Sequence, residues 1–185
     1  TYKRSSMNLQ NADIANGAKM LDKASRIAII GSGGNLSIAQ HAASDIQRHT
    51  GKFCFAPDSV HLTAVGNDVD WKYEWVAYAA QHCDLVLGIS ARSESPMIRV
   101  LDEFGFGIPT LVIAPKKVNS PYIHTITIPC KYYHEFEVNA LWTIYMLMEY
   151  NGVKLPALPE SKPSKTFLTT LLFIALILMV LCSLI

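Results

Sequence analysis

The sequence predicts an α/β fold, namely a three-layer α/β/α sandwich around a central parallel sheet. Short apolar runs alternate with longer segments of helical periodicity along most of the chain, as expected where helices connect parallel strands. Most of these runs are apolar throughout, which is typical of strands that are buried on both faces. At 185 residues, the chain is long enough for one such domain with its own core.

Helices are predicted where apolar residues recur every three or four positions between recognisable end signals. Ser95 before Pro96 is the clearest start, because serine caps a first turn and proline fits within it. Gly51 and Gly152 stand where two of the helices are expected to end. The predicted helices span residues 7–24, 35–50, 71–81, 96–104 and 134–150, with a short helix after a turn at 57–59.

Strands are predicted where short apolar runs are bounded by glycine, proline or polar residues. The predicted strands span residues 26–30, 52–56, 84–90, 109–114 and 123–128. Because these strands alternate with helices, each helix can cross over from one strand to the next, and the sheet is expected to be parallel.

Composition argues against nucleic acid as the partner. Sixteen Lys and Arg against fifteen Asp and Glu leave a net charge of +1, and no run of like charge is present. The four cysteines lack the paired spacing of a disulfide framework. This usage fits a reducing compartment, so we expect the folded domain to be cytoplasmic.

The C-terminal segment 166–185 is uncharged and almost wholly apolar. A helix of about twenty such residues can cross a ~30 Å hydrocarbon layer, and the three lysines that precede it favour a cytoplasmic domain. We expect a membrane tether rather than a buried terminal helix. Because the first residue is not methionine, we also expect the natural chain to begin further upstream. The expected parts are a folded domain over 1–153, a proline-containing linker over 154–165 and a transmembrane tail helix over 166–185.

Two strand ends carry residues that are suited to binding an anion. The first strand runs into Gly31-Ser32-Gly33-Gly34-Asn35, and the strand over 84–90 runs into Ser90 to Ser95. Glycines let the backbone approach a ligand closely, and the amides at a helix start favour a phosphate. Taken alone, the first loop is equally well explained as an ordinary connection. Carboxyl ends of parallel strands share one edge of a sheet, so both loops can face one ligand.

Together with three other features, these loops resemble the sugar isomerase (SIS) family in order and spacing. The three features are His41, Gly66-Asn67-Asp68 and His134-Glu135. The resemblance covers about residues 8–152 and is greatest to the phosphoheptose isomerase branch, which interconverts sedoheptulose 7-phosphate and a mannoheptose 7-phosphate. It implies the SIS fold, a phosphorylated sugar as ligand, and a homo-oligomer, either a tetramer or a dimer.

The resemblance implies substrate-binding roles for loop residues, although the second loop departs from the family's Ser-Thr-Ser-Gly-Asn-Ser. Ser93 replaces a glycine, which is costly if φ is positive there. Arg92 can compensate as a guanidinium clamp on phosphate, whereas Glu94 would repel phosphate unless it points away. The implied substrate-binding residues are Gly33, Gly34, Asn35, Asn67, Asp68, Ser90, Arg92, Ser93 and Ser95.

The resemblance also implies a metal site, with zinc as the expected ion. In the family the ligands come from the helix after the first loop and from the last helix, and the matching positions are His41, Asp45, His134 and Trp142. Trp142 cannot bind a metal, so the implied ligands are His41, Asp45 and His134. Residues four apart share a helix face, so His41 and Asp45 can point into one site.

The family's reaction moves a proton between adjacent sugar carbons through an enediolate, which requires a base and a group that stabilises the oxyanion. The candidate catalytic residues are Asp45, Glu135 and Glu137. Glu137, one turn after His134, is also open as a replacement ligand. The large aromatic residues of the last helix region are expected in the core or at a subunit interface; they are Tyr132, Tyr133, Trp142 and Tyr145.

Two functions remain open from the sequence. The protein is either an aldose-ketose isomerase that supplies a mannoheptose 7-phosphate for surface polysaccharide precursors, or a catalytically impaired SIS module. Such a module would bind a phosphosugar or a protein partner in a regulatory role. The preserved loop order favours the isomerase, whereas Trp142, Arg92 and Glu94 favour the impaired module.

Overall fold

Five parallel strands form one sheet at the centre of the fold. The computed structural model describes residues 12–58, 70–105 and 107–157. The chain divides into two units, Thr1–Leu155 and Pro156–Ile185, and the fold described here is that of the first. The strands lie in the order β2-β1-β3-β4-β5, which confirms the predicted parallel sheet. They are β1 (Arg26–Gly31), β2 (Phe53–Phe55), β3 (Leu85–Ile89), β4 (Thr110–Ala114) and β5 (Ile123–Thr127).

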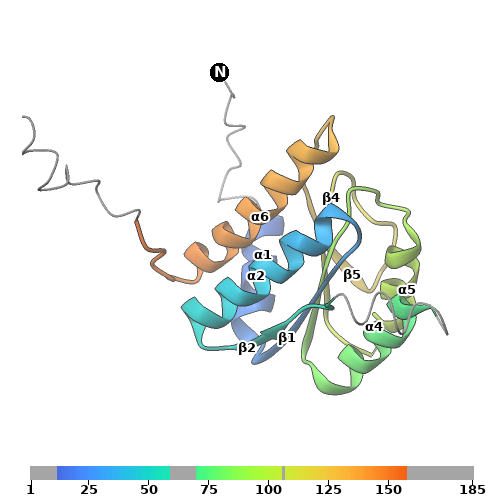
Figure 1. Cartoon of the computed structure of the whole chain (residues 1–185), viewed down its shortest axis with the longest axis horizontal. Coiled ribbons are helices and arrows are strands. Elements are labelled where there is room, and N and C mark those ends of the chain that lie inside the picture. The colour runs from blue at the N-terminus through green and yellow to red at the C-terminus, as the bar shows by residue number, and fades with distance from the viewer. Residues whose placement is uncertain (1–11, 59–69, 106, 158–185) are drawn as a thin grey trace, which may run out of the picture. The chain divides into compact units, whose positions relative to one another are not determined.

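Helices cover both faces of the sheet, as a three-layer sandwich requires. Figure 1 shows α1, α2 and α6 on one face and α4 and α5 on the other. The Ser95 side chain caps α5 by accepting a hydrogen bond from the amide of Ile98, and α2 ends at Gly51 in the left-handed conformation. The helices are α1 (Ala12–Lys23), α2 (Gly34–Thr50), α4 (Trp71–His82), α5 (Pro96–Phe104) and α6 (Tyr133–Tyr150).

Each strand contributes side chains to two separate cores, because successive residues of a strand point to opposite faces. In β1, Ile27 and Ile29 pack under α1, α2 and α6, while Ala28 and Ile30 pack under α4 and α5. Both faces of the sheet are therefore buried, which explains why β1, β3 and β4 are almost wholly apolar rather than alternating.

Several predictions fall on residues outside the described ranges. These include the start of the helix predicted over 7–24, the short helix after the turn at 57–59, and the tail helix over 166–185. Within the described ranges, no helix has both the length and the apolar character needed to span a bilayer. The transmembrane tail and the membrane tether therefore stay predictions.

Leu87 lies in β3, the central strand, and has no exposed surface. Leu87→Ala should lower the free energy of unfolding by about 2–5 kcal/mol, because it removes buried methyl groups and leaves a cavity. Val138→Ala is the control, because Val138 is 58% exposed and should change the value little. Urea unfolding measures both changes. Equal losses for the two variants would contradict the core described above.

Candidate functional site

The two loops that are expected to bind an anion meet at one edge of the sheet. β1 and β3 pair in parallel with Gly31 opposite Ile89, so the loops that follow these strands lie side by side. Between the N-termini of α2 and α5 lies a pocket of about 470 Å³. Its lining is Ser32, Gly33, Gly34, Asn35, Lys72, Ile89, Ser90, Ala91, Arg92, Ser95, Pro96, Met97, Tyr133 and Glu137.

The first loop brings a buried polar side chain to this pocket. Gly33 precedes α2 with φ 62 and ψ −131, a backbone conformation that residues with a side chain rarely adopt. The next turn buries Asn35, which is 8% exposed, and its Oδ1 has no hydrogen-bond partner among the described residues. A buried acceptor without a donor is costly, so Asn35 is suited to accept a hydrogen bond from a ligand hydroxyl.

Ser90 and Ser95 hold the second loop in place at the pocket. The Ser90 hydroxyl donates to the Arg92 carbonyl at 2.7 Å and lies 3.0 Å from the Ser95 hydroxyl. Both serines line the pocket, and so does Arg92. The start of α5 and a guanidinium group are therefore available to one anion.

Ser93 and Glu94 do not line the pocket. The Ser93 hydroxyl donates to the Lys116 carbonyl at 2.9 Å and accepts from the Lys116 amide at 3.2 Å, so Ser93 ties its loop to the segment after β4. No described residue other than glycine has a positive φ, so Ser93 does not need the freedom of a glycine. Glu94 is exposed and lies outside the lining, so the repulsion considered above does not arise within the pocket.

Glu137 brings α6 to the same pocket. A Cβ atom on Gly34 would lie 2.1 Å from Glu137 Oε1, so the carboxylate packs directly against the first turn of α2. Only a glycine at position 34 allows this close approach. The negative carboxylate thus lies beside the positive end of α2, and Gly34 and Glu137 line the pocket together.

Lys72 is a pocket residue that the sequence did not indicate. It lies in the first turn of α4, with its Nζ 3.5 Å from Asp70 Oδ1, and it lines the pocket. Nothing in the local pattern distinguishes it from a surface lysine. Lys72 is therefore a second cationic residue of the pocket, in addition to Arg92.

Two predicted site residues lie outside the pocket lining at the start of α6. The Glu135 carboxylate accepts a hydrogen bond from the Lys131 amide at 3.0 Å, which stabilises the chain entering the helix. The exposed His134 ring stacks on Tyr132 with ring centroids 5.5 Å apart. The predicted substrate-binding residues Asn67 and Asp68 lie outside the described residues.

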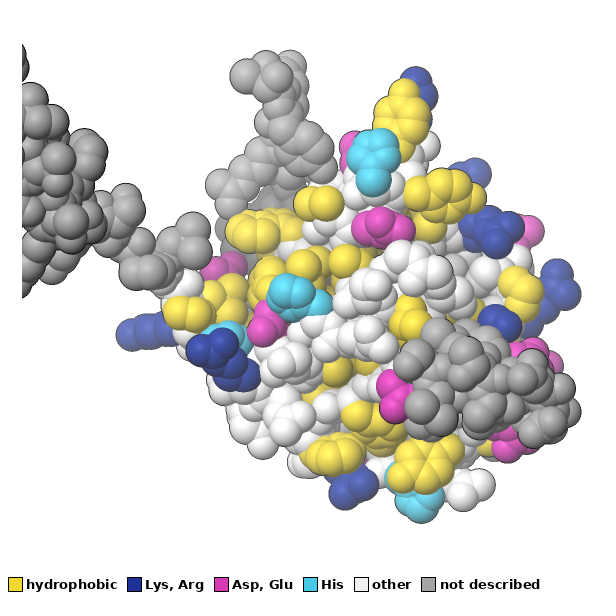
Figure 2. Space-filling model, in the orientation of Figure 1, with side chains coloured by type: hydrophobic (Ala, Val, Ile, Leu, Met, Phe, Trp, Pro, Cys, Tyr) yellow, Lys and Arg dark blue, Asp and Glu magenta, His cyan; other side chains and the backbone are white. Residues whose placement is uncertain are grey.

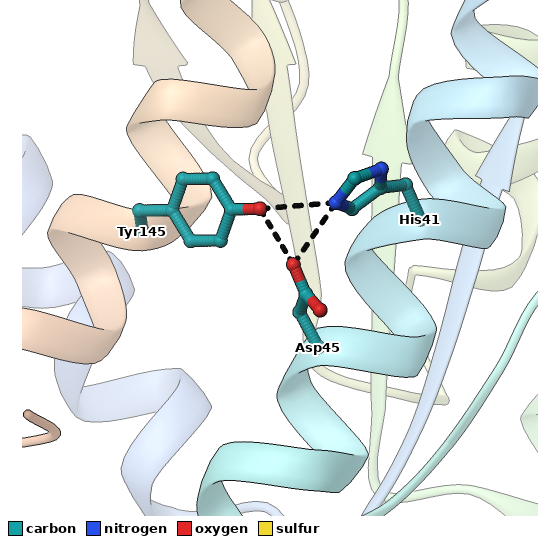
Figure 3. A network of polar contacts seen from close by, with 3 residues as sticks. All are labelled: His41, Asp45 and Tyr145. Carbon is teal, nitrogen blue, oxygen red and sulfur yellow. Dashed lines mark hydrogen bonds and ion pairs between the residues drawn. The ribbon is translucent and has the colours of Figure 1, made fainter. Parts of the chain in front are cut away.

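His41 and Asp45 do lie together, and Tyr145 joins them (Figure 3). His41 Nε2 is 3.1 Å from Asp45 Oδ2, as expected for residues four apart on α2. The Tyr145 hydroxyl, from α6, donates to Asp45 Oδ2 at 2.5 Å and lies 3.1 Å from His41 Nε2. The sequence placed Tyr145 in the core or an interface. Its partners are a hundred residues away in the chain, so no local pattern indicates them.

This cluster of three is partly open to solvent. The His41 side chain is 55% exposed and that of Asp45 is 19% exposed. In Figure 2, a histidine and an acidic side chain adjoin one another over α2, beside hydrophobic side chains. Burial raises the pKa of Tyr145 to about 12, with further contributions from its hydrogen bond to Asp45 and from the negative charge of that carboxylate. Tyr145 therefore stays a hydrogen-bond donor at neutral pH.

The structure does not bring His134 to this cluster. His134 and Tyr145 lie on one helix, eleven residues or ~16 Å apart along its axis, and the described part of the chain holds no group of three His, Cys, Asp or Glu side chains able to bind a metal. Within one chain, His41, Asp45 and His134 thus do not fit a shared zinc ion.

Comparison with known proteins finds similar proteins that are named phosphoheptose isomerase. No family model matches the chain. A phosphoheptose isomerase from Pelobacter propionicus is 34% identical over 87 residues, which cover 42% of this chain and 46% of the relative. The match thus spans about half of that relative's length.

Solved structures share the fold over a larger part of the chain. A phosphoheptose isomerase from Neisseria gonorrhoeae has a TM-score of 0.58 at 20% identity, covering 76% of this chain and 86% of its own. One from Francisella tularensis has a TM-score of 0.59 at 19% identity, covering 75% and 83%. The predicted resemblance to the phosphoheptose isomerase branch of the SIS family is confirmed by these similarities, and the fold is that of the phosphosugar isomerases.

The pKa of Tyr145 tests the geometry of the cluster. With ¹³C-labelled tyrosine, the resonance that is absent in Tyr145→Phe should titrate near pH 12, above the ordinary value of 10. Asp45→Asn should lower that pKa, because it removes a negative charge beside the phenol. Between pH 10 and about 12, the folded protein keeps the Tyr145 hydroxyl proton, whereas the unfolded chain loses it. The contribution of Tyr145 to stability is therefore present below pH 10 and falls between pH 10 and about 12.

A midpoint near 10 in the wild-type protein would contradict the contact between Tyr145 and Asp45. Tyr150→Phe serves as the control, because Tyr150 is 46% exposed on the same helix and its loss should leave the Tyr145 resonance unchanged.

Proposed function

We propose that this protein is an aldose-ketose isomerase of a phosphorylated heptose, interconverting sedoheptulose 7-phosphate and a mannoheptose 7-phosphate. One observation carries the proposal: two anion-binding loops, two cationic side chains and a carboxylate line a single pocket at the carboxyl edge of the sheet. The similarity to proteins named phosphoheptose isomerase supports the choice of a heptose as the sugar.

The phosphate binds at the start of α5 in this proposal. Ser95 caps that helix and contacts Ser90, and the positive dipole end at this point favours a dianion. Arg92 supplies a guanidinium that can bind two phosphate oxygens, and Lys72 adds a further positive charge. The sugar then extends toward α2, where Asn35 Oδ1, which has no partner among the described residues, accepts a hydrogen bond from a hydroxyl group.

Glu137 acts as the base. Of the three acidic candidates from the sequence, only Glu137 lines the pocket, since Glu135 bonds the Lys131 amide and Asp45 bonds Tyr145. The carboxylate takes the proton from C1 of the ketose and returns it to C2 through the enediolate, while a proton moves between the two oxygens. The positive end of α2, next to Glu137, lies where it can stabilise the developing oxyanion.

The cellular setting rests on the sequence alone. We propose that the aldose product feeds surface polysaccharide precursors, and that the tail over 166–185 holds the cytoplasmic domain at the membrane where such polymers are assembled. A homo-oligomer, tetramer or dimer, follows from the resemblance. The regulatory alternative, an impaired module that binds a phosphosugar or a protein partner, is not favoured by the comparisons.

Glu137→Gln tests the role of the base. The variant keeps the size of the side chain but cannot accept the proton, so kcat for sedoheptulose 7-phosphate should fall about 10²–10⁴-fold while the Kd changes little. Glu135→Gln is the matched control. Its amide oxygen can still accept the Lys131 N–H bond, and kcat should stay near the wild-type value.

Aldose formation, followed over time by NMR, gives the rate, and calorimetry gives the Kd. Unchanged turnover in Glu137→Gln would remove Glu137 as the base. Binding without any turnover in the wild-type protein would overturn the isomerase and support the regulatory alternative.

Arg92→Ala tests the position of the phosphate. Loss of a charge-assisted hydrogen bond should weaken binding of sedoheptulose 7-phosphate by about 10-fold or more, while any weak binding of unphosphorylated sedoheptulose should not change. Arg99→Ala is the control, since Arg99 is an exposed arginine of α5 that does not line the pocket. Equal weakening by both substitutions would show that Arg92 acts only through the general charge of this surface.

A further inference from the structure

His41, Asp45 and Tyr145 form a cluster in which each side chain contacts the other two. Each of the three polar atoms, His41 Nε2, Asp45 Oδ2 and the Tyr145 hydroxyl, lies within 3.1 Å of the other two. The cluster joins two helices, because His41 and Asp45 belong to α2 and Tyr145 belongs to α6 (Figure 3).

The contacts indicate where the protons between these three atoms lie. The Tyr145 phenol has one hydrogen, and the 2.5 Å contact directs it to Asp45. The phenol oxygen and the carboxylate oxygen then both face His41 Nε2 with lone pairs, so Nε2 must carry a hydrogen and donate. In this arrangement Nε2 has no lone pair for a metal, since a histidine ligand must bind through a deprotonated nitrogen.

The donor set around the cluster also falls short of a zinc site. Protein zinc sites have three or four His, Cys, Asp or Glu ligands. Here the described residues supply two, and the third place next to them is taken by a phenol whose proton is held by Asp45. A phenol that keeps its proton is a poor metal ligand.

We propose that Tyr145 takes the place of a metal ion at this site, so that a hydrogen-bonded cluster joins α2 to α6 and the protein does not require zinc. The inference concerns how the site is held together and does not depend on the sugar or the reaction proposed above.

The cluster lies along the same helix pair as the contact between Glu137 and Gly34. Tyr145 lies eight residues after Glu137 on α6, and His41 lies seven residues after Gly34 on α2, so both contacts fall along the same pair of helices, about two turns apart.

Zinc binding to the full chain, purified without a histidine tag, tests the proposal. Equilibrium dialysis against zinc should find no stoichiometric zinc on the wild-type protein. Tyr145→His places an imidazole beside His41 and Asp45, and this variant should bind about one zinc per chain. The added His41→Ala substitution should abolish that binding. Tyr150→His is the matched control, since it adds a histidine to an exposed position of the same helix and should bind no zinc.

One zinc per wild-type chain, lost in His41→Ala, would overturn the proposal. A folded Tyr145→His variant that binds no zinc would overturn the claim that Tyr145 occupies the third ligand position. The wild-type measurement stands even if Tyr145→His does not fold. Melting temperature gives a second readout: the wild-type value should be the same with zinc and with a chelator, and a zinc-dependent rise that His41→Ala removes would contradict the proposal.

Discussion

The parallel pairing of β1 with β3 is the interaction on which the candidate site depends. Residues about sixty positions apart in the chain become neighbours because Gly31 lies opposite Ile89 at the carboxyl edge of the sheet. Both strands are followed by helices that point their N-termini at the same space, so two positive dipole ends face one pocket. The buried apolar strands thus stabilise the fold and also align the polar loops.

The packing of α6 against α2 adds the groups that a binding pocket alone would lack. Gly34 lets the Glu137 carboxylate approach the first turn of α2, which puts an acidic group among cationic and neutral ones. Further along the same two helices, Tyr145 bonds Asp45 and contacts His41. The packing of α6 against α2 therefore places both the Glu137 carboxylate in the pocket and the cluster of His41, Asp45 and Tyr145.

Much of the fold could be predicted from the sequence because its signals are local. Apolar runs gave the five strands, and Ser95 with Pro96 marked the start of α5 where the structure has it. The meeting of the two loops also followed from sheet topology. The roles of side chains were harder to predict, since they depend on contacts between distant segments. Ser93 bonds Lys116 and leaves the pocket, and Tyr145 gains a polar role only because α6 lies beside α2.

In the proposed binding mode, the phosphate lies at α5 and the reacting carbons lie at Glu137. A crystal structure of the protein with sedoheptulose 7-phosphate tests this most directly. We expect phosphate oxygens in contact with Ser90, Arg92 and Ser95, and C1 and C2 within reach of the Glu137 carboxylate. A sugar bound outside this pocket, or bound with C1 and C2 turned away from Glu137, would contradict it.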